Sequence, residues 1–159
     1  MAVTDVATSD YHIDTVEEHL GKIFGPSDPV TVDQLRIQGF ADVTGDHQWI
    51  HVDVDRAKAE SPFGGPIAHG YLTLSLLAAA QMELGIVPKG AKGVMNYGLD
   101  KVRFLAPVPS GAQLEVRAEL TGVERKEGGR ILLRTKVVAQ QVGADSPALI
   151  ADSLALAFG

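Results

Sequence analysis

The sequence lacks cysteine, an excess of positive charge and any long hydrophobic run. Without cysteine the chain can form no disulfide and no thiolate metal site. Its 14 Lys and Arg stand against 20 Asp and Glu, for a net charge of -6. This balance argues against a nucleic-acid partner, because binding to phosphates depends on clustered cations. The longest apolar run, around residues 72–80, is far shorter than the roughly 20 residues that cross a membrane.

The length and composition are those of one folded domain, with 159 residues of which 45% are hydrophobic. We expect this domain to occupy residues 12–159. Residues 1–11 are polar and acidic, and without a basic start and an apolar stretch they are expected to be a flexible lead, not a signal peptide. The predicted location is therefore the cytoplasm, with no membrane contact.

The first third of the chain carries two helix-capping patterns. Thr15 with Glu18 predicts a short helix that stops before Gly21, and Thr31 with Gln34 predicts a second helix that ends by Gly45. From 45 to 68 the sequence is rich in Asp, His, Pro and Gly, with little periodicity apart from a candidate helical turn at 56–60. A connection of this length is usually functional when it is ordered.

The rest of the chain changes from helical to strand periodicity. Residues 70–84 contain no proline and almost no charge, and they are apolar nearly all round, as in a helix enclosed by protein. Period-two alternation then predicts strands, with a charged hairpin tip at 124–129. The predicted strands are 94–105, 113–123, 130–141 and 148–158. Helices followed by strands indicate an α+β domain in which an antiparallel sheet covers one central helix.

A carboxylate and an imidazole stand five residues apart where the second helix gives way to the loop. Asp46 and His51, if they share one water, can take a proton from it and return a proton elsewhere, as a reversible hydration requires. The structural alternative is that Asp46 caps the following turn and His51 packs at a strand edge.

The motif Pro-Ile-Ala-His-Gly, residues 66–70, leads into the predicted central helix. Free N–H groups and the helix dipole at such a start favour a developing negative charge. The Gly70 N–H is the expected oxyanion donor, since glycine lets a ligand approach the backbone closely. Alternatively, Gly65 and Gly70 only permit tight turns. His69 either orders the helix start or makes a structural hydrogen bond.

This order of residues resembles the MaoC-like dehydratases and R-specific enoyl-CoA hydratases, particularly the branch similar to nodulation protein N. The likeness rests on Thr44-Gly45-Asp46, His51 and the 66–70 motif, and it extends from about residue 15 to residue 158. It implies a hot-dog fold, homodimerisation through a continuous sheet, and hydration of trans-2-enoyl-CoA to the (3R)-hydroxyacyl-CoA. No resident cofactor is implied, because coenzyme A is part of the acyl-thioester substrate.

By motif position, the resemblance makes Asp46 and His51 the catalytic pair and Gly70 the oxyanion donor. His69 and Tyr71 flank that glycine, and we place both in the substrate-binding region, Tyr71 as a pocket wall.

The chain departs from the commoner family pattern at two places. Many members have Asn and Pro where this chain has Gln48 and Trp49; Gln48 can still offer its amide to the water. Some members also have a serine that steadies the aspartate, at the position of Ala78 here. Ser75, one helical turn earlier, is a candidate substitute by its position alone.

The remaining polar residues carry weaker signals. His47 lies beside Asp46, but three suitably spaced metal ligands are absent, so we expect no metal site. The clustered cations Lys89, Lys92, Lys101 and Arg103 are candidates for contacts with coenzyme A phosphates.

Two other functions stay open at this point. An acyl-CoA thioesterase uses the same fold with a carboxylate near the central helix, but it need not have His51. A non-catalytic acyl-binding subunit of a heterodimer is the second alternative. The presence of both Asp46 and His51 in this chain counts against that reading.

Overall fold

The structure is a computed structural model that describes residues 10–159. Most of the predicted flexible lead, residues 1–9, lies outside the described part. Tyr11, which the prediction assigns to the lead, belongs to the packed core: its ring is buried and its hydroxyl donates to the Ile86 carbonyl at 2.7 Å. The packed region therefore begins before His12.

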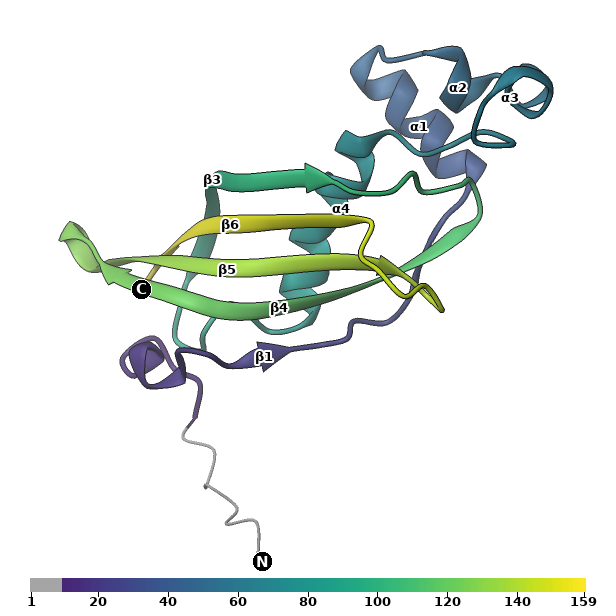
Figure 1. Cartoon of the computed structure of the whole chain (residues 1–159). Helices are drawn as coiled ribbons and strands as arrows, with labels where there is room; N and C mark the ends of the chain where they lie inside the picture. Colours follow the sequence, from purple (N-terminus) through teal and green to yellow (C-terminus); the bar gives the residue numbers. More distant parts are fainter. Residues whose placement is uncertain (1–9) are drawn as a thin grey trace, which may run out of the picture.

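Six strands form one antiparallel sheet (Figure 1). They pair in the order β1-β4-β5-β6-β3, and β2 pairs with β4. The strands are β1 Ile23–Phe24, β2 Val30–Val32, β3 Gly93–Phe104, β4 Ala112–Arg125, β5 Arg130–Gln141 and β6 Leu149–Phe158. The four long strands confirm the predictions from period-two alternation. β1 and β2 are too short to show a period, and the sequence did not predict them.

The helical segments are η1 Val16–His19, α1 Gln34–Thr44, α2 Trp49–Val52, α3 Val54–Glu60, α4 Gly70–Glu83 and, at the predicted hairpin tip, η2 Glu127–Gly129. As predicted, α1 ends at Gly45, which has a left-handed φ of 84° that glycine adopts without strain. Both capping boxes are wrong. The Thr15 side chain does not cap η1, and Asp33, not Thr31, caps α1 by accepting the Arg36 N–H at 2.8 Å.

The segment between α1 and α4 is more regular than the sequence pattern predicts. It contains the two short helices α2 and α3, whereas only a turn at 56–60 was expected. Asp53 caps α3 by accepting the Arg56 N–H at 3.1 Å. The Asp, Pro and Gly residues of this region delimit short helices, and these helices are too short to show a helical period.

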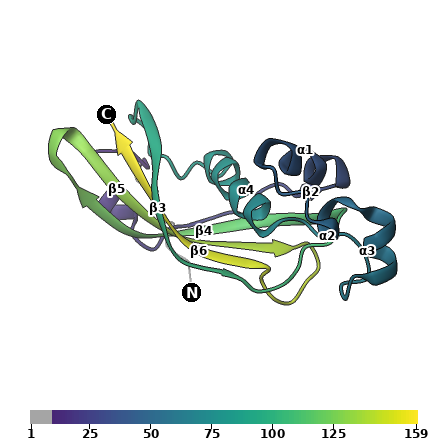
Figure 2. The same cartoon turned by 90° about the horizontal axis from the view of Figure 1, so that it is seen from above.

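Helices α1 and α4 lie on the same face of the sheet (Figure 2). The side of α4 that faces the sheet is buried, with Leu77 and Ala80 in one hydrophobic cluster with Leu133 and Val137. The opposite side of α4 is open. Tyr71 is 71% exposed there, so residues 10–159 enclose this apolar helix on one side only.

Among residues 10–159, no helix combines the length and the apolar character needed to span a membrane. The apolar helix α4 has 14 residues. The cytoplasmic location expected from the sequence stays a prediction.

Candidate active site

Two hydrogen bonds join α2 to the segment that precedes α4 and fix His51. The Ile67 N–H donates to the Ile50 carbonyl at 3.1 Å, and His51 Nδ1 lies 2.7 Å from the Ile67 carbonyl oxygen. Because a carbonyl only accepts, Nδ1 carries the proton and Nε2 keeps a lone pair. Burial lowers the pKa of His51 below its ordinary value of 6.5, so the ring is neutral at pH 7 and Nε2 can accept a proton.

Asp46 lies on the loop that follows α1. Its Oδ1 accepts the Gln48 N–H at 3.3 Å, so Asp46 does cap the following turn, as the structural alternative expected. Its other carboxylate oxygen has no donor among residues 10–159, and the residue is exposed. Gln48 is also exposed at the start of α2, with its side-chain amide not bonded to the described protein. Asp46 can therefore cap the turn and still bind a water.

His69, the residue before α4, is buried between Asp46 and His51 with 2% of its surface exposed. Its Nε2 lies 2.9 Å from the backbone oxygen of Asp46. Its ring stacks on that of His51, with centroids 3.9 Å apart and an interplanar angle of 25°. His51 therefore packs against a second imidazole inside the protein and not at a strand edge.

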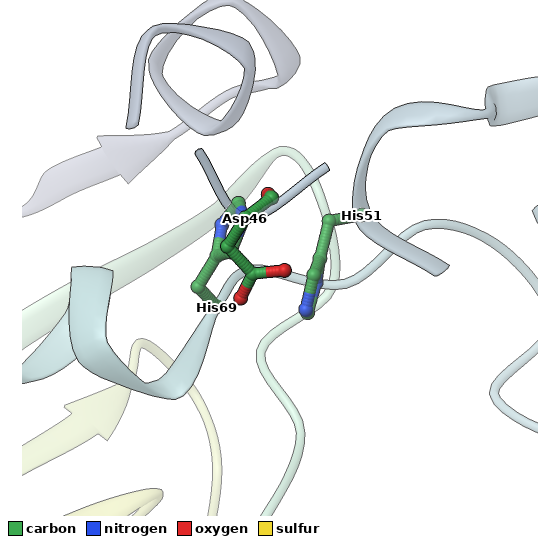
Figure 3. Close-up of side chains that lie close together, drawn as sticks. All are labelled: Asp46, His51 and His69. Carbon is green, nitrogen blue, oxygen red and sulfur yellow. The ribbon is translucent and has the colours of Figure 1, made fainter. Parts of the chain in front are cut away.

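Figure 3 shows Asp46 beside both imidazole rings, with one carboxylate oxygen directed toward His51. One potential ligand atom from each of the three residues lies within 4.8 Å of the others. A metal would need imidazole lone pairs, which lie in the ring planes, to converge on one point. The near-parallel stacking opposes such convergence. The cluster is better arranged for proton transfer than for metal binding.

His47 lies outside this cluster despite its position next to Asp46. It is exposed, and its Nε2 lies 3.0 Å from Asp42 Oδ1. The hydrogen bond with Asp42 raises the pKa of His47, in the opposite direction to the shift at His51. His47 and His51 are close in sequence but have opposite environments, because the His47 ring is solvated beside a carboxylate and the His51 ring is buried.

The N-terminus of α4 offers free backbone donors. The N–H groups of Gly70 and Tyr71 have no acceptor within the described part of the chain, whereas those of the next two residues donate to the His69 carbonyl at 3.1 and 3.2 Å. A Cβ at Gly70 would lie 3.1 Å from the Phe104 ring, so a side chain there would force a shift. Close packing against Phe104 therefore favours glycine at this position. The same residue lies at a helix N-terminus, where free N–H groups can bind an anionic oxygen.

A largely apolar pocket of about 260 Å³ connects His51 with Gly70. Ile67, Thr73 and Phe104 also line it. Sequence reasoning missed the Ile67 carbonyl, although the residue lies inside the 66–70 motif, and it missed Phe104. No local signal marks Phe104, because its place beside Gly70 depends on the long-range pairing of β3.

Ser75, the substitute considered for the supporting serine, makes no hydrogen bond to Asp46. The Ser75 hydroxyl donates to the Tyr71 carbonyl at 2.7 Å. Ser75 and Ala78 line, with Tyr71, a separate hollow of about 460 Å³ along the open side of α4. Tyr71 does not line the pocket that reaches His51 and Gly70, although its ring contacts Phe104 edge-on at a centroid distance of 6.2 Å. Its role as a wall of the substrate pocket stays a prediction.

The four clustered cations separate into two groups. Lys89 and Lys92 follow the C-terminus of α4, about 20 Å along the helix from Gly70. Lys89 pairs with Asp10 at 2.7 Å. Lys101 and Arg103 lie in the part of β3 that ends at Phe104, on the Gly70 side. Only this second pair lies at the same end as the His51 cluster.

Comparison with known proteins identifies the family of this chain. Residues 15–142 match the model of the MaoC like domain. The chain is 46% identical over 134 residues to 3-hydroxyacyl-thioester dehydratase Z of Mycobacterium tuberculosis, covering 84% of this chain and 87% of that protein. It is 43% identical over 139 residues to nodulation protein N of Rhizobium leguminosarum bv. viciae, covering 86% and 85%.

Among solved structures, the unliganded R-hydratase PhaJ1 of Pseudomonas aeruginosa superposes with a TM-score of 0.69 at 26% identity, over 94% of this chain and 86% of that one. The antiparallel sheet around α4 is thus the hot-dog fold expected from the sequence. The chain belongs to the MaoC-like dehydratase family of hydro-lyases.

Proposed function

We propose that this protein adds water reversibly across the double bond of trans-2-enoyl-CoA and forms the (3R)-hydroxyacyl-CoA. The observation that carries the proposal is the meeting of a neutral His51, the Asp46 carboxylate and the free Gly70 N–H at one end of α4. The printed names of the relatives, a 3-hydroxyacyl-thioester dehydratase and an R-hydratase, support the same reaction. Coenzyme A is then part of the substrate, and the reaction needs no resident cofactor.

In the proposed mechanism, Asp46 and His51 hold one water against the β-carbon of the substrate. His51 Nε2 takes a proton from the water as its oxygen bonds to that carbon. The electrons of the double bond move toward the thioester carbonyl, which accepts the N–H of Gly70 with the N–H of Tyr71 as a second donor. The same proton returns to the α-carbon, so one H and one OH have been added. Gln48 offers its amide to the water.

The Asp46 carboxylate has two tasks in this scheme. It orients the water before reaction, and its negative charge stabilises the imidazolium that His51 becomes for part of the cycle. Asp46 already raises the pKa of His51, although the opposing effect of burial is larger. The carboxylate therefore favours proton uptake during the reaction, while burial keeps the resting imidazole neutral.

The substrate is proposed to lie at the end of the molecule that contains the N-terminus of α4. Its enoyl group occupies the apolar pocket that includes Ile67 and Phe104. The coenzyme A phosphates then meet exposed cations at the same end, and we propose Lys101 and Arg103 for these contacts.

The proposed assembly is a homodimer. Strand β3 is an edge of the sheet with 12 residues, and it exposes Met95, Tyr97 and Leu99. The open side of α4 lies next to it, as the hollow shared by Tyr71 and Leu99 indicates. A long edge strand with apolar side chains is a template for pairing with another chain. A second copy that extends the sheet at β3 would cover both surfaces.

The test is an assay with crotonyl-CoA that follows both possible reactions. Hydration removes the conjugated enoyl absorbance without releasing thiol, and chiral analysis of the product should give the (3R) alcohol. A thioesterase would release free coenzyme A and leave the double bond intact. A purified chain that does the latter, or that turns over neither bond as a stable homodimer, would contradict the hydratase proposal.

A further inference from the structure

We infer that His69 is a positioning residue for this reaction: it holds the Asp46 backbone and presents its ring face to His51, without touching the substrate. The inference rests on the proposed function of Asp46 and His51. It explains how the carboxylate is supported in a chain where Ser75 bonds elsewhere and Ala78 offers no polar group.

The burial of His69 excludes direct contact with substrate. The residue is 2% exposed and does not line the pocket that reaches His51 and Gly70. Its ring is packed between His51 and Phe40, whose ring centroid lies 4.9 Å away. Any effect of His69 on the reaction must therefore act through the residues it contacts.

The hydrogen bond with Asp46 fixes the proton on the His69 ring. The Asp46 carbonyl only accepts, so His69 Nε2 is the protonated nitrogen. The Nδ1 atom is buried without a partner in the described protein. A proton there would add an N–H without an acceptor and a charge against a second imidazole, both of which are costly in the interior.

The surroundings of the His51 ring act on its pKa in both directions. Burial and the neighbouring His69 lower this pKa, whereas the hydrogen bond with the Ile67 carbonyl and the Asp46 carboxylate raise it. The stacking also blocks one face of the ring. Together with the bond from Nδ1 to Ile67, it leaves His51 one orientation, in which the Nε2 lone pair is available.

A role in capping alone does not explain the imidazole. Residues that cap helices through side chains are usually Ser, Thr, Asp or Asn, which accept an N–H of the first turn. His69 precedes α4 but makes no side-chain capping bond. Its side chain reaches instead across 23 residues of sequence to the loop that carries Asp46.

Two substitutions separate the hydrogen bond from the ring. His69→Gln places an amide N–H near the position of Nε2 and keeps the donor to the Asp46 carbonyl. His69→Leu fills similar space without a donor. We expect the kcat of the leucine variant for crotonyl-CoA to be roughly a hundredfold below that of the wild type, with little change in KM. Without the hydrogen bond to its backbone, Asp46 is displaced, and a small displacement of a catalytic group is enough to slow the reaction. The glutamine variant should recover most of that loss.

A histidine outside the site provides the control. His12 lies at the other end of the fold, where it forms an isolated bridge with Lys89. His12→Gln should leave kcat and KM at their wild-type values. Thermal melting identifies any variant that has lost its fold. A folded His69→Leu with wild-type kcat, or equal losses in the leucine and glutamine variants, would overturn the positioning role.

A readout without substrate keeps this inference separate from the proposed function. Nitrogen-15 NMR of the imidazoles should show a proton on Nε2 of His69 and on Nδ1 of His51 in the wild type. In His69→Leu the His51 resonances should shift and its titration midpoint should rise. If these changes occur but no protein form hydrates crotonyl-CoA, the proposed function fails while the coupling stands. Unchanged His51 resonances would refute the coupling itself.

Discussion

The start of α4 and its open side are built in opposite ways. At the start, the rings of His51 and His69 are buried, and each ring bonds to a backbone carbonyl of the same chain. Along the open side, Tyr71 and Met82 expose 71% and 58% of their surface beside the free edge of β3. The two imidazole rings are thus held by contacts within one chain, whereas residues 10–159 leave the apolar surface beside them uncovered.

The largest expected effect is at the start of α4. Asp46→Asn keeps the shape of the side chain and removes its charge, and His51→Ala removes the base. Each should lower kcat for crotonyl-CoA hydration by roughly two to four powers of ten, with the fold retained. Loss of the enoyl absorbance measures the rate, and circular dichroism checks the fold. Wild-type rates in both variants would mean that the reaction uses another centre.

The next effect concerns the open side. Leu99→Lys adds a charge to the exposed edge strand β3, where it should weaken dimerisation about a hundredfold by removing apolar contact and burying a cation. Sedimentation across micromolar concentrations measures the dimer fraction. The matched control is Leu35→Lys on α1, where the native side chain is already 82% exposed. If both variants associate as the wild type does, β3 is not the interface.

A smaller effect is expected from pH, and it contrasts two neighbouring histidines. Burial lowers the pKa of His51, so its neutral form persists below pH 6.5 and kcat/KM should fall only at lower pH. Because the pKa of His51 is lower in the folded chain than in the unfolded chain, the stability that His51 contributes is present above pH 6.5. This contribution is lost as the pH falls, since the unfolded chain then binds a proton more readily. The hydrogen bond to Asp42 raises the pKa of His47, so its NMR titration should lie above 6.5.

The observation that would contradict this prediction is an acid limb of kcat/KM centred above pH 6.5. It would indicate either that the reacting base is not the buried His51 or that substrate-free His51 is far more solvated than the stacked arrangement allows. NMR titration of His51 in the free protein separates these two explanations.

The smallest effect should distinguish the two ends of the fold. Arg103→Gln, at the Gly70 end, should raise KM for crotonyl-CoA roughly two- to fivefold with little change in kcat, as expected for an exposed ionic contact. Lys89→Gln, at the far end of α4, should change neither constant. A crotonyl thioester without the coenzyme A phosphates should be insensitive to both substitutions. An effect of Lys89 alone would place the phosphates at the opposite end.

Much of the fold could be read from local pattern. The four long strands follow from alternation, and α4 follows from its uninterrupted apolar sequence. The helices α2 and α3 could not be predicted in the same way, because four and seven residues are too few to display a helical period. Their stability depends on contacts with other elements, such as the hydrogen bond at 2.8 Å from the Gln34 side-chain amide of α1 to the His51 carbonyl of α2.

By itself, the sequence determined the four long strands, the apolar helix α4 and the order of Asp46, His51 and Gly70, because these follow from local propensity and from motif spacing. Only the tertiary structure decided the state of those groups. The tautomer of His51 and the support of Asp46 depend on contacts that cross 16 and 23 residues of sequence, respectively. Burial and hydrogen bonding are properties of the packed chain, so no local pattern could indicate that His69 faces inward or that α4 is covered on only one side.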